Sequence, residues 1–134
     1  MKRILWTVLG AALVTAACAD PTAPTTPTPA VPTMTDTFSD TLLVAGTNTH
    51  IFNVTTIGGV KVTLNSVVPG ASVAVGVGTP SLGSCSVIDH VVSVADQAAQ
   101  LSGTATVPGQ YCVIIQDSGN LVEPVVYTIN VLHS

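Results

Sequence analysis

The three cysteines are the residues of this chain whose chemistry the sequence constrains most. Cys85 and Cys112 lie in the C-terminal half of the 134 residues, whereas Cys18 ends a largely apolar N-terminal segment. With Cys18 set aside, the remaining pair is even, and an oxidising compartment favours a disulfide between the two thiols. Free thiols or a redox pair are the alternative, but the chain has no C-x-x-C spacing. We therefore predict a structural disulfide between Cys85 and Cys112.

The segment Asp-Ser-Gly-Asn at residues 117–120 is a second place where the side chains suggest chemistry. Its carboxylate and amide oxygens are the kind of ligand that Ca²⁺ prefers. The competing interpretation is a turn, because Asp and Asn bond to their own backbone and Gly accepts a positive φ. We favour the turn and predict no metal or other cofactor, which leaves Asp117 and Asn120 as the candidate ligands of the calcium alternative.

A catalytic site would need a nucleophile, a base and a group that orients the base. Serines are plentiful, but the chain has no G-x-S-x-G motif, and the three histidines, at positions 50, 90 and 133, are scattered. His50 alternates with Phe52, which is typical of a residue that lines a strand face. A zinc site built from these histidines would require that the fold bring all three together. We therefore predict that the protein is not an enzyme.

The charge balance excludes one class of partner. The chain has seven acidic and three basic residues, and two of the basic ones are Lys2 and Arg3. Without these two the formal charge is 1 − 7 = −6, with Lys61 as the single cation. Nucleic-acid binding requires several Lys and Arg side chains to neutralise phosphates. We therefore predict no nucleic-acid partner.

The N-terminus has the pattern of an export signal. The positive start Met-Lys-Arg precedes an apolar run over residues 4–14, which is too short to span a bilayer. Ala-Ala-Cys at residues 16–18 resembles the end of a bacterial lipobox, although Thr15 stands where that motif usually has Leu, Val or Ile. Ordinary cleavage at the small residues Ala17 and Ala19, with free secretion, is the alternative. We predict a signal peptide over residues 1–17, lipid on Cys18, and a bacterial cell-envelope protein held at the membrane by this anchor.

Residues 18–35 are predicted to form a tether between the lipid and a folded domain. Five prolines fall between positions 21 and 33, interleaved with Thr, Ala and Val. Proline has no backbone N–H for a helix or a strand ladder, and repeated prolines favour an extended polyproline-like chain. The tether would hold the domain away from the membrane surface.

From residue 36 to residue 134 the composition changes to alternating apolar and hydroxyl residues with frequent turn signals. This pattern predicts an all-β, antiparallel β-sandwich of about eight strands with one disulfide. The first strand is expected over residues 38–44, and residues 96–100 could form a single helical turn. Residues 109–116 are apolar on both faces, which predicts a strand in the middle of a sheet. The segment between residues 85 and 95 is compatible with strand or loop.

Five short segments suggest a family: Phe-Ser-Asp-Thr-Leu at residues 38–42, His-Ile-Phe-Asn-Val at 50–54, Val-Lys-Val-Thr-Leu at 60–64, Gly-Gln-Tyr-Cys-Val at 109–113 and Tyr-Thr-Ile-Asn-Val at 127–131. Together they resemble the bacterial pre-peptidase C-terminal (PPC-like) domain. The resemblance implies a jelly-roll-like sandwich, found attached to secreted hydrolases and also alone, often with carbohydrate- or matrix-binding relatives.

The function that follows is display of a module rather than catalysis. We expect a non-enzymatic cell-envelope lipoprotein whose single β-sandwich serves structural or protein-interaction purposes. A carbohydrate- or matrix-binding module is the alternative. Sugar-binding sandwiches use exposed aromatic rings as stacking platforms. The four aromatic residues beyond the signal all stand at positions that we expect to be in the core (Phe38, Phe52, Tyr111 and Tyr127).

Overall fold

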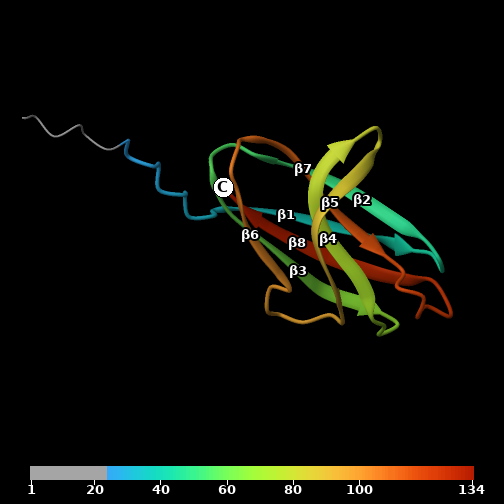
Figure 1. Cartoon of the computed structure of the whole chain (residues 1–134). Coiled ribbons are helices and arrows are strands. Elements are labelled where there is room, and N and C mark those ends of the chain that lie inside the picture. Colours follow the sequence, from blue (N-terminus) through green and yellow to red (C-terminus); the bar gives the residue numbers. More distant parts are fainter. Residues whose placement is uncertain (1–23) are drawn as a thin grey trace, which may run out of the picture.

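The computed structural model describes residues 24–134, which form eight strands and no helix. The strands make two four-stranded sheets packed face to face (Figure 1). The strands are β1 (Met34–Leu42), β2 (Thr47–Val54), β3 (Gly58–Val68), β4 (Val73–Ser81), β5 (Ser84–Ser93), β6 (Leu101–Ala105), β7 (Gly109–Gln116) and β8 (Val125–His133).

The order of the strands is that of a jelly roll. One sheet runs β1-β8-β3-β6 and the other β2-β7-β4-β5, and every pairing within a sheet is antiparallel. Within the described residues, β4 and β5 are the one pair of consecutive strands that share a sheet, so the chain otherwise crosses between sheets at each connection. This confirms the predicted antiparallel, jelly-roll-like sandwich of eight strands.

The core lies between the sheets and is built by alternation along the central strands. In β8 the residues Val125, Tyr127, Ile129 and Val131 are buried, and each is separated from the next by a more exposed residue. In β7 both Val113 and Ile115 are fully buried. β7 lies between β2 and β4, so the prediction of a central strand over residues 109–116 is confirmed. Alternation places these side chains on the inner face because successive residues of a strand point to opposite sides.

Two predicted elements differ from the structure. β1 begins at Met34 and ends at Leu42, instead of running from residue 38 to residue 44, because its ladder with β8 starts at the pair Met34 and His133. Residues 96–100 form no helical turn. Their backbone amides bond to the neighbouring strand instead, from Asp96 N to the carbonyl of Leu64 and from Gln100 N to the carbonyl of Val62. These non-local bonds replace the local ones that a helical turn would need.

The end of the proline-rich segment is attached to the domain. Ala30 forms an isolated bridge with Gly58, with its N–H 2.8 Å from the carbonyl oxygen of Ile57. Thr33 donates to the carbonyl of His133. Residues 24–29 make no such bridge and lead away from the sandwich (Figure 1). Within the described residues, backbone bonding to the sandwich thus begins at Ala30.

Candidate functional site

The predicted disulfide is present. Cys85, at the start of β5, is bonded to Cys112 of β7, with their Cα atoms 5.9 Å apart. β4 lies between β5 and β7 in the sheet, so the bond links two strands that are not neighbours. Gly78 of β4 pairs with Cys112, and a Cβ at this glycine would collide with the backbone of Ser86. Both cysteines are buried, which makes this a structural crosslink rather than an exposed redox pair.

Asp117 organises a turn at the end of β7. Its Oδ2 accepts a hydrogen bond from the N–H of Ala45 at 2.8 Å, and its Oδ1 accepts bonds from the N–H groups of Gly119, Asn120 and Leu121. The bond from Ala45 and the three others hold the pKa of the Asp117 carboxyl below its usual value, against the opposing effect of burial.

Asn120 does not turn its side chain toward this carboxylate. Its Nδ2 donates to Ser118 Oγ at 2.7 Å, and Gly119 has a φ of 89°. Within residues 24–134, no group of three or more His, Cys, Asp or Glu side chains is arranged to hold a metal ion. Through its bond from Ala45, Asp117 links the β1–β2 turn to the loop that leads into β8.

A second polar cluster lies where the edge strands β1 and β2 meet. His50 Nε2 lies 2.6 Å from the hydroxyl of Tyr127, and Asn48 Nδ2 donates to the same oxygen at 3.1 Å. The ring of Phe38 stacks on His50 with centroids 4.7 Å apart. Partial burial lowers the pKa of His50, opposed by the charge of Asp40, and burial raises the pKa of Tyr127.

The protonation of this cluster follows from its hydrogen bonds. Because Asn48 donates to the phenol oxygen, all groups are satisfied when Tyr127 donates its hydrogen to Nε2 of a neutral His50. In this arrangement the Tyr127 hydroxyl accepts from Asn48 and donates to His50. The cluster fastens β8, through Tyr127, to β2 of the opposite sheet.

The other two histidines are in different surroundings. His133 is buried at the end of β8, with Nε2 3.1 Å from Asp36 Oδ2 and its ring tilted against Phe52. His90 is exposed on β5, opposite Gly76 of β4. Neither is joined to His50 in a group that could hold a metal ion.

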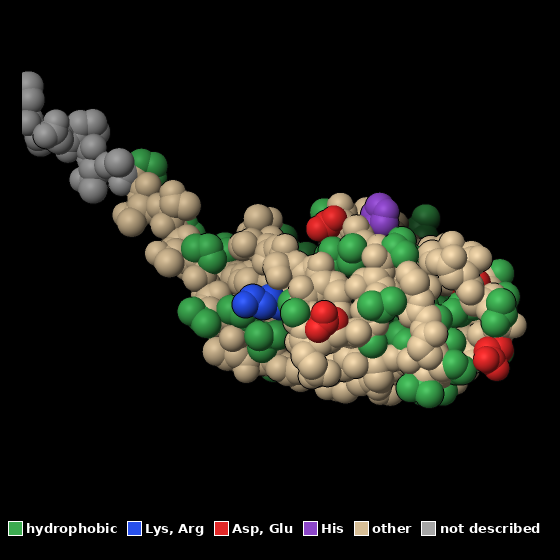
Figure 2. All heavy atoms as spheres, turned by 90° about the horizontal axis from the view of Figure 1, so that it is seen from below, with side chains coloured by type: hydrophobic (Ala, Val, Ile, Leu, Met, Phe, Trp, Pro, Cys, Tyr) green, Lys and Arg blue, Asp and Glu red, His purple; other side chains and the backbone are tan. Residues whose placement is uncertain are grey.

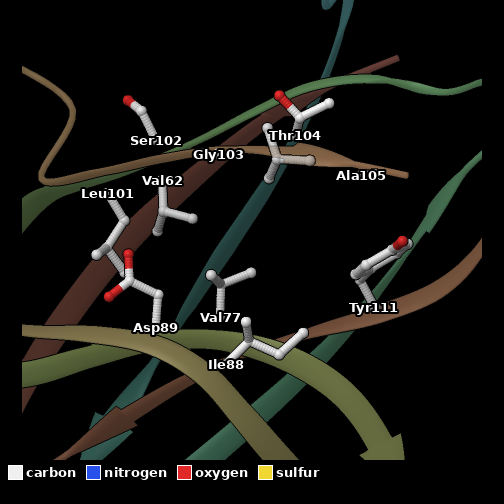
Figure 3. Close-up of a pocket in the computed structure, with 11 residues that line it drawn as sticks. Val62, Val77, Ile88, Asp89, Leu101, Ser102, Gly103, Thr104, Ala105 and Tyr111 are labelled. Carbon is white, nitrogen blue, oxygen red and sulfur yellow. The ribbon is translucent and has the colours of Figure 1, made fainter. Parts of the chain in front are cut away.

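A hollow in the described part of the molecule lies between the edge strands β5 and β6. It is a cleft of about 250 Å³ that opens between the two sheets (Figure 3). Strand residues of both sheets line it: Val60, Val62, Val77, Ile88, Asp89, Leu101, Ser102, Gly103, Thr104, Ala105 and Tyr111. Sequence reasoning missed this site. Two signals were present, a glycine inside a strand-like segment and an acid within an apolar run, but neither indicates a cleft until the sheet edges are known.

The surface carries few charged groups. Figure 2 shows mostly uncharged side chains and backbone, with green apolar patches between them. Lys61 is exposed on β3 and is the single Lys or Arg within residues 24–134. No helix in this range is long and apolar enough to cross a membrane.

The predicted lipidation site, Cys18, lies outside the described residues. In the comparisons with known proteins, no family model matches the chain and no curated protein matches it significantly.

Proposed function

We propose that this protein is a non-enzymatic, exported lipoprotein that displays one β-sandwich from the bacterial cell envelope for structural or protein-interaction purposes. The observation that carries the proposal is the combination of a disulfide-linked sandwich with an extended Pro/Thr segment at its N-terminal side. Disulfides form and persist in oxidising compartments, which supports export of the chain. The lipid anchor rests on the position of Cys18 directly after Ala16 and Ala17.

The length of the proline-rich segment suits a spacer. Ala30, where the described chain first bonds to the sandwich, lies twelve positions after Cys18. An extended proline-rich chain rises by about 3.1 Å per residue, so this spacer would reach roughly 35 Å. That distance exceeds the thickness of a lipid headgroup layer, and it would leave the surface of the sandwich free for a partner.

The positions of the aromatic rings favour display over carbohydrate binding. Phe52 and Tyr127 are buried, Phe38 packs on His50, and Tyr111 packs beside Phe52. Flat sugar recognition uses rings that face solvent, and these four do not supply such a platform. The jelly-roll order is nevertheless the one that the resemblance to PPC-like domains implies, and we retain that relationship as part of the proposal.

Metabolic labelling tests the anchor. In a bacterial host, the wild-type chain should incorporate labelled palmitate and sediment with membranes, and Cys18→Ser should lose the label. Thr15→Leu restores the usual lipobox residue and should increase the labelled fraction. The anchor is wrong if the label persists in Cys18→Ser, or if the unmodified wild-type chain appears free in the medium.

A further inference from the structure

We propose that the cleft between β5 and β6 binds a small organic cation, namely a primary amine carried on an apolar body. This inference goes beyond display of the sandwich and does not depend on the lipid anchor. It rests on three features of the described residues: a hollow left by a glycine, an apolar wall, and a single carboxylate that no cation neutralises.

The hollow arises from the absence of one side chain. Gly103 pairs with Val60 in the β3–β6 ladder, and its neighbours at alternate positions, Leu101 and Ala105, are buried on the inner face. A Cβ built on Gly103 would have no atom within 4 Å. Its φ is not positive, so this backbone position does not require glycine. The choice of glycine here therefore leaves space open at the edge of the core.

The wall of the cleft is apolar and belongs to the core. Val60, Val62 and Leu101 face it from one sheet, and Val77 faces it from the other. The cleft is open to solvent and has a volume of about 250 Å³. Apolar cavities of roughly 150 Å³ already accept benzene. The cleft thus has room for an apolar body at least as large as one ring.

Asp89 supplies the charge. It pairs with Val77 and, like Val77, points to the inner side of the sheet, next to the bulge that displaces Ile88. In Figure 3 its carboxylate reaches across the cleft toward Leu101. One oxygen, Oδ1, accepts the N–H of His90 at 2.8 Å. Asp89 is exposed, and its second oxygen has no hydrogen bond to any described residue, so this oxygen is open to solvent and to a ligand.

No cation of the described chain neutralises this carboxylate. The ion pair that the structure contains within residues 24–134 joins His133 to Asp36, far along the sequence from Asp89. Lys61 is exposed, and it alternates with Val60 and Val62, which line the cleft, so it points to the other face of β3. A ligand with an apolar body would gain binding free energy by burying its surface against the apolar walls of the cleft. An ammonium group on the same ligand would pair with Asp89. An anionic head group would be repelled.

Three probes with the same ring separate the contribution of the apolar walls from that of the Asp89 charge. At pH 7 benzylamine is positive, benzyl alcohol is neutral and benzoate is negative. They are titrated into the exported full-length chain carrying Cys18→Ser, which keeps every described residue. Backbone amide NMR shifts of residues lining the cleft report binding. We expect saturable shifts, with benzylamine binding about threefold or more tighter than benzyl alcohol, as suits a pair with an exposed carboxylate. Benzoate should bind most weakly.

Two variants assign the effect to its residues. Asp89→Asn keeps the shape of the side chain and removes its charge, so benzylamine and benzyl alcohol should bind it equally. Gly103→Val fills the hollow, and it should abolish the shifts for all three probes. Glu123→Gln is the matched control, because it removes an exposed acid that does not line the cleft and should leave the threefold preference unchanged.

Several results would overturn the proposal. The first is the absence of saturable shifts at the cleft with benzylamine at millimolar concentration. Others are equal binding of amine and alcohol by the parent chain, and an amine preference that survives in Asp89→Asn. An inward-pointing charge can also protect an edge strand from pairing with another chain. If Asp89→Asn self-associates while the parent chain binds no amine, that protective role replaces the binding role.

Discussion

Loss of the crosslink between Cys85 and Cys112 should destabilise the domain strongly. The lost free energy of unfolding follows from the length of the loop that the crosslink closes. The two residues are 27 positions apart. In the chain-entropy model, a closed loop of that length lowers the entropy of the unfolded state by an amount worth about 3.5 kcal/mol at 25 °C. The loop contains all of β6, which pairs with β3 on one side and has no strand on the other. The crosslink thus closes a loop that includes this edge strand.

The perturbation is the double variant Cys85→Ala/Cys112→Ala. Alanine is preferred to serine because Cys112 is fully buried and a hydroxyl there would add the cost of an unpaired polar group. A loss of about 3.5 kcal/mol should lower the melting temperature by about 14 °C or more for a domain of this size. Urea unfolding followed by far-ultraviolet circular dichroism measures the free energy directly.

The single variants make this prediction refutable. Either Cys85→Ala or Cys112→Ala breaks the same bond, so each alone should lose nearly as much as the double variant. The slope of the unfolding free energy against urea should also rise, because the unlinked chain exposes more surface when unfolded. A loss below about 1 kcal/mol, or single-variant losses that add up to the double, would refute the loop-closure reasoning.

Two further predictions concern acid. Partial burial lowers the pKa of His50 below 6.5, so the unfolded chain binds this proton more readily than the folded one. The contribution of His50 to the free energy of unfolding should therefore be fully present above pH 6.5. It should be lost as the pH drops toward the pKa of His50 in the folded chain. His50→Gln should flatten that part of the curve of urea midpoint against pH, and an unchanged slope would contradict the argument. The pKa of Asp117 is also lowered, from 3.8, by its backbone donors. Its contribution should be present above pH 3.8 and be lost as the pH falls through the folded value, whereas Asp117→Asn should be less stable at neutral pH and lack this acid step, with Glu123→Gln as the control.

Much of the fold follows from local pattern. The two apolar faces of residues 109–116 are enough to predict a central strand, because an edge or half-exposed strand would need one polar face. The disulfide follows from parity and compartment, since two cysteines remain when Cys18 is assigned to the lipid. In the turn after β7, the bonds of Asp117 to the next residues and the positive φ of Gly119 follow from local rules, whereas the bond from Ala45 N–H to Asp117 does not.

The two predictions that were wrong concern features that depend on contacts between residues far apart in the sequence. Residues 96–100 have a helical composition over one turn, but the carbonyl groups of Val62 and Leu64 offer their amides partners from β3. The start of β1 at Met34 is set by its ladder with β8, nearly 100 positions later in the chain. A single sequence does not indicate which strands become neighbours, so it predicts neither feature.

For the same reason, the sequence does not predict a cleft at Asp89 and Gly103, because it does not indicate which strands lie beside each other. A jelly roll of two sheets has two open sides, one where β1 faces β2 and one where β6 faces β5. The first side is closed by the stacked rings of Phe38 and His50 and by the hydroxyl of Tyr127. At the second side the gap stays open beside Gly103, which has no side chain, and the residues that line it include the acid Asp89 and the ring of Tyr111. Because one side of the sandwich is closed by large side chains, the jelly roll itself does not require a hollow at the other. The open space follows from Gly103 and the charge beside it from Asp89, so Gly103→Val and Asp89→Asn test the two features separately without changing the topology of the fold.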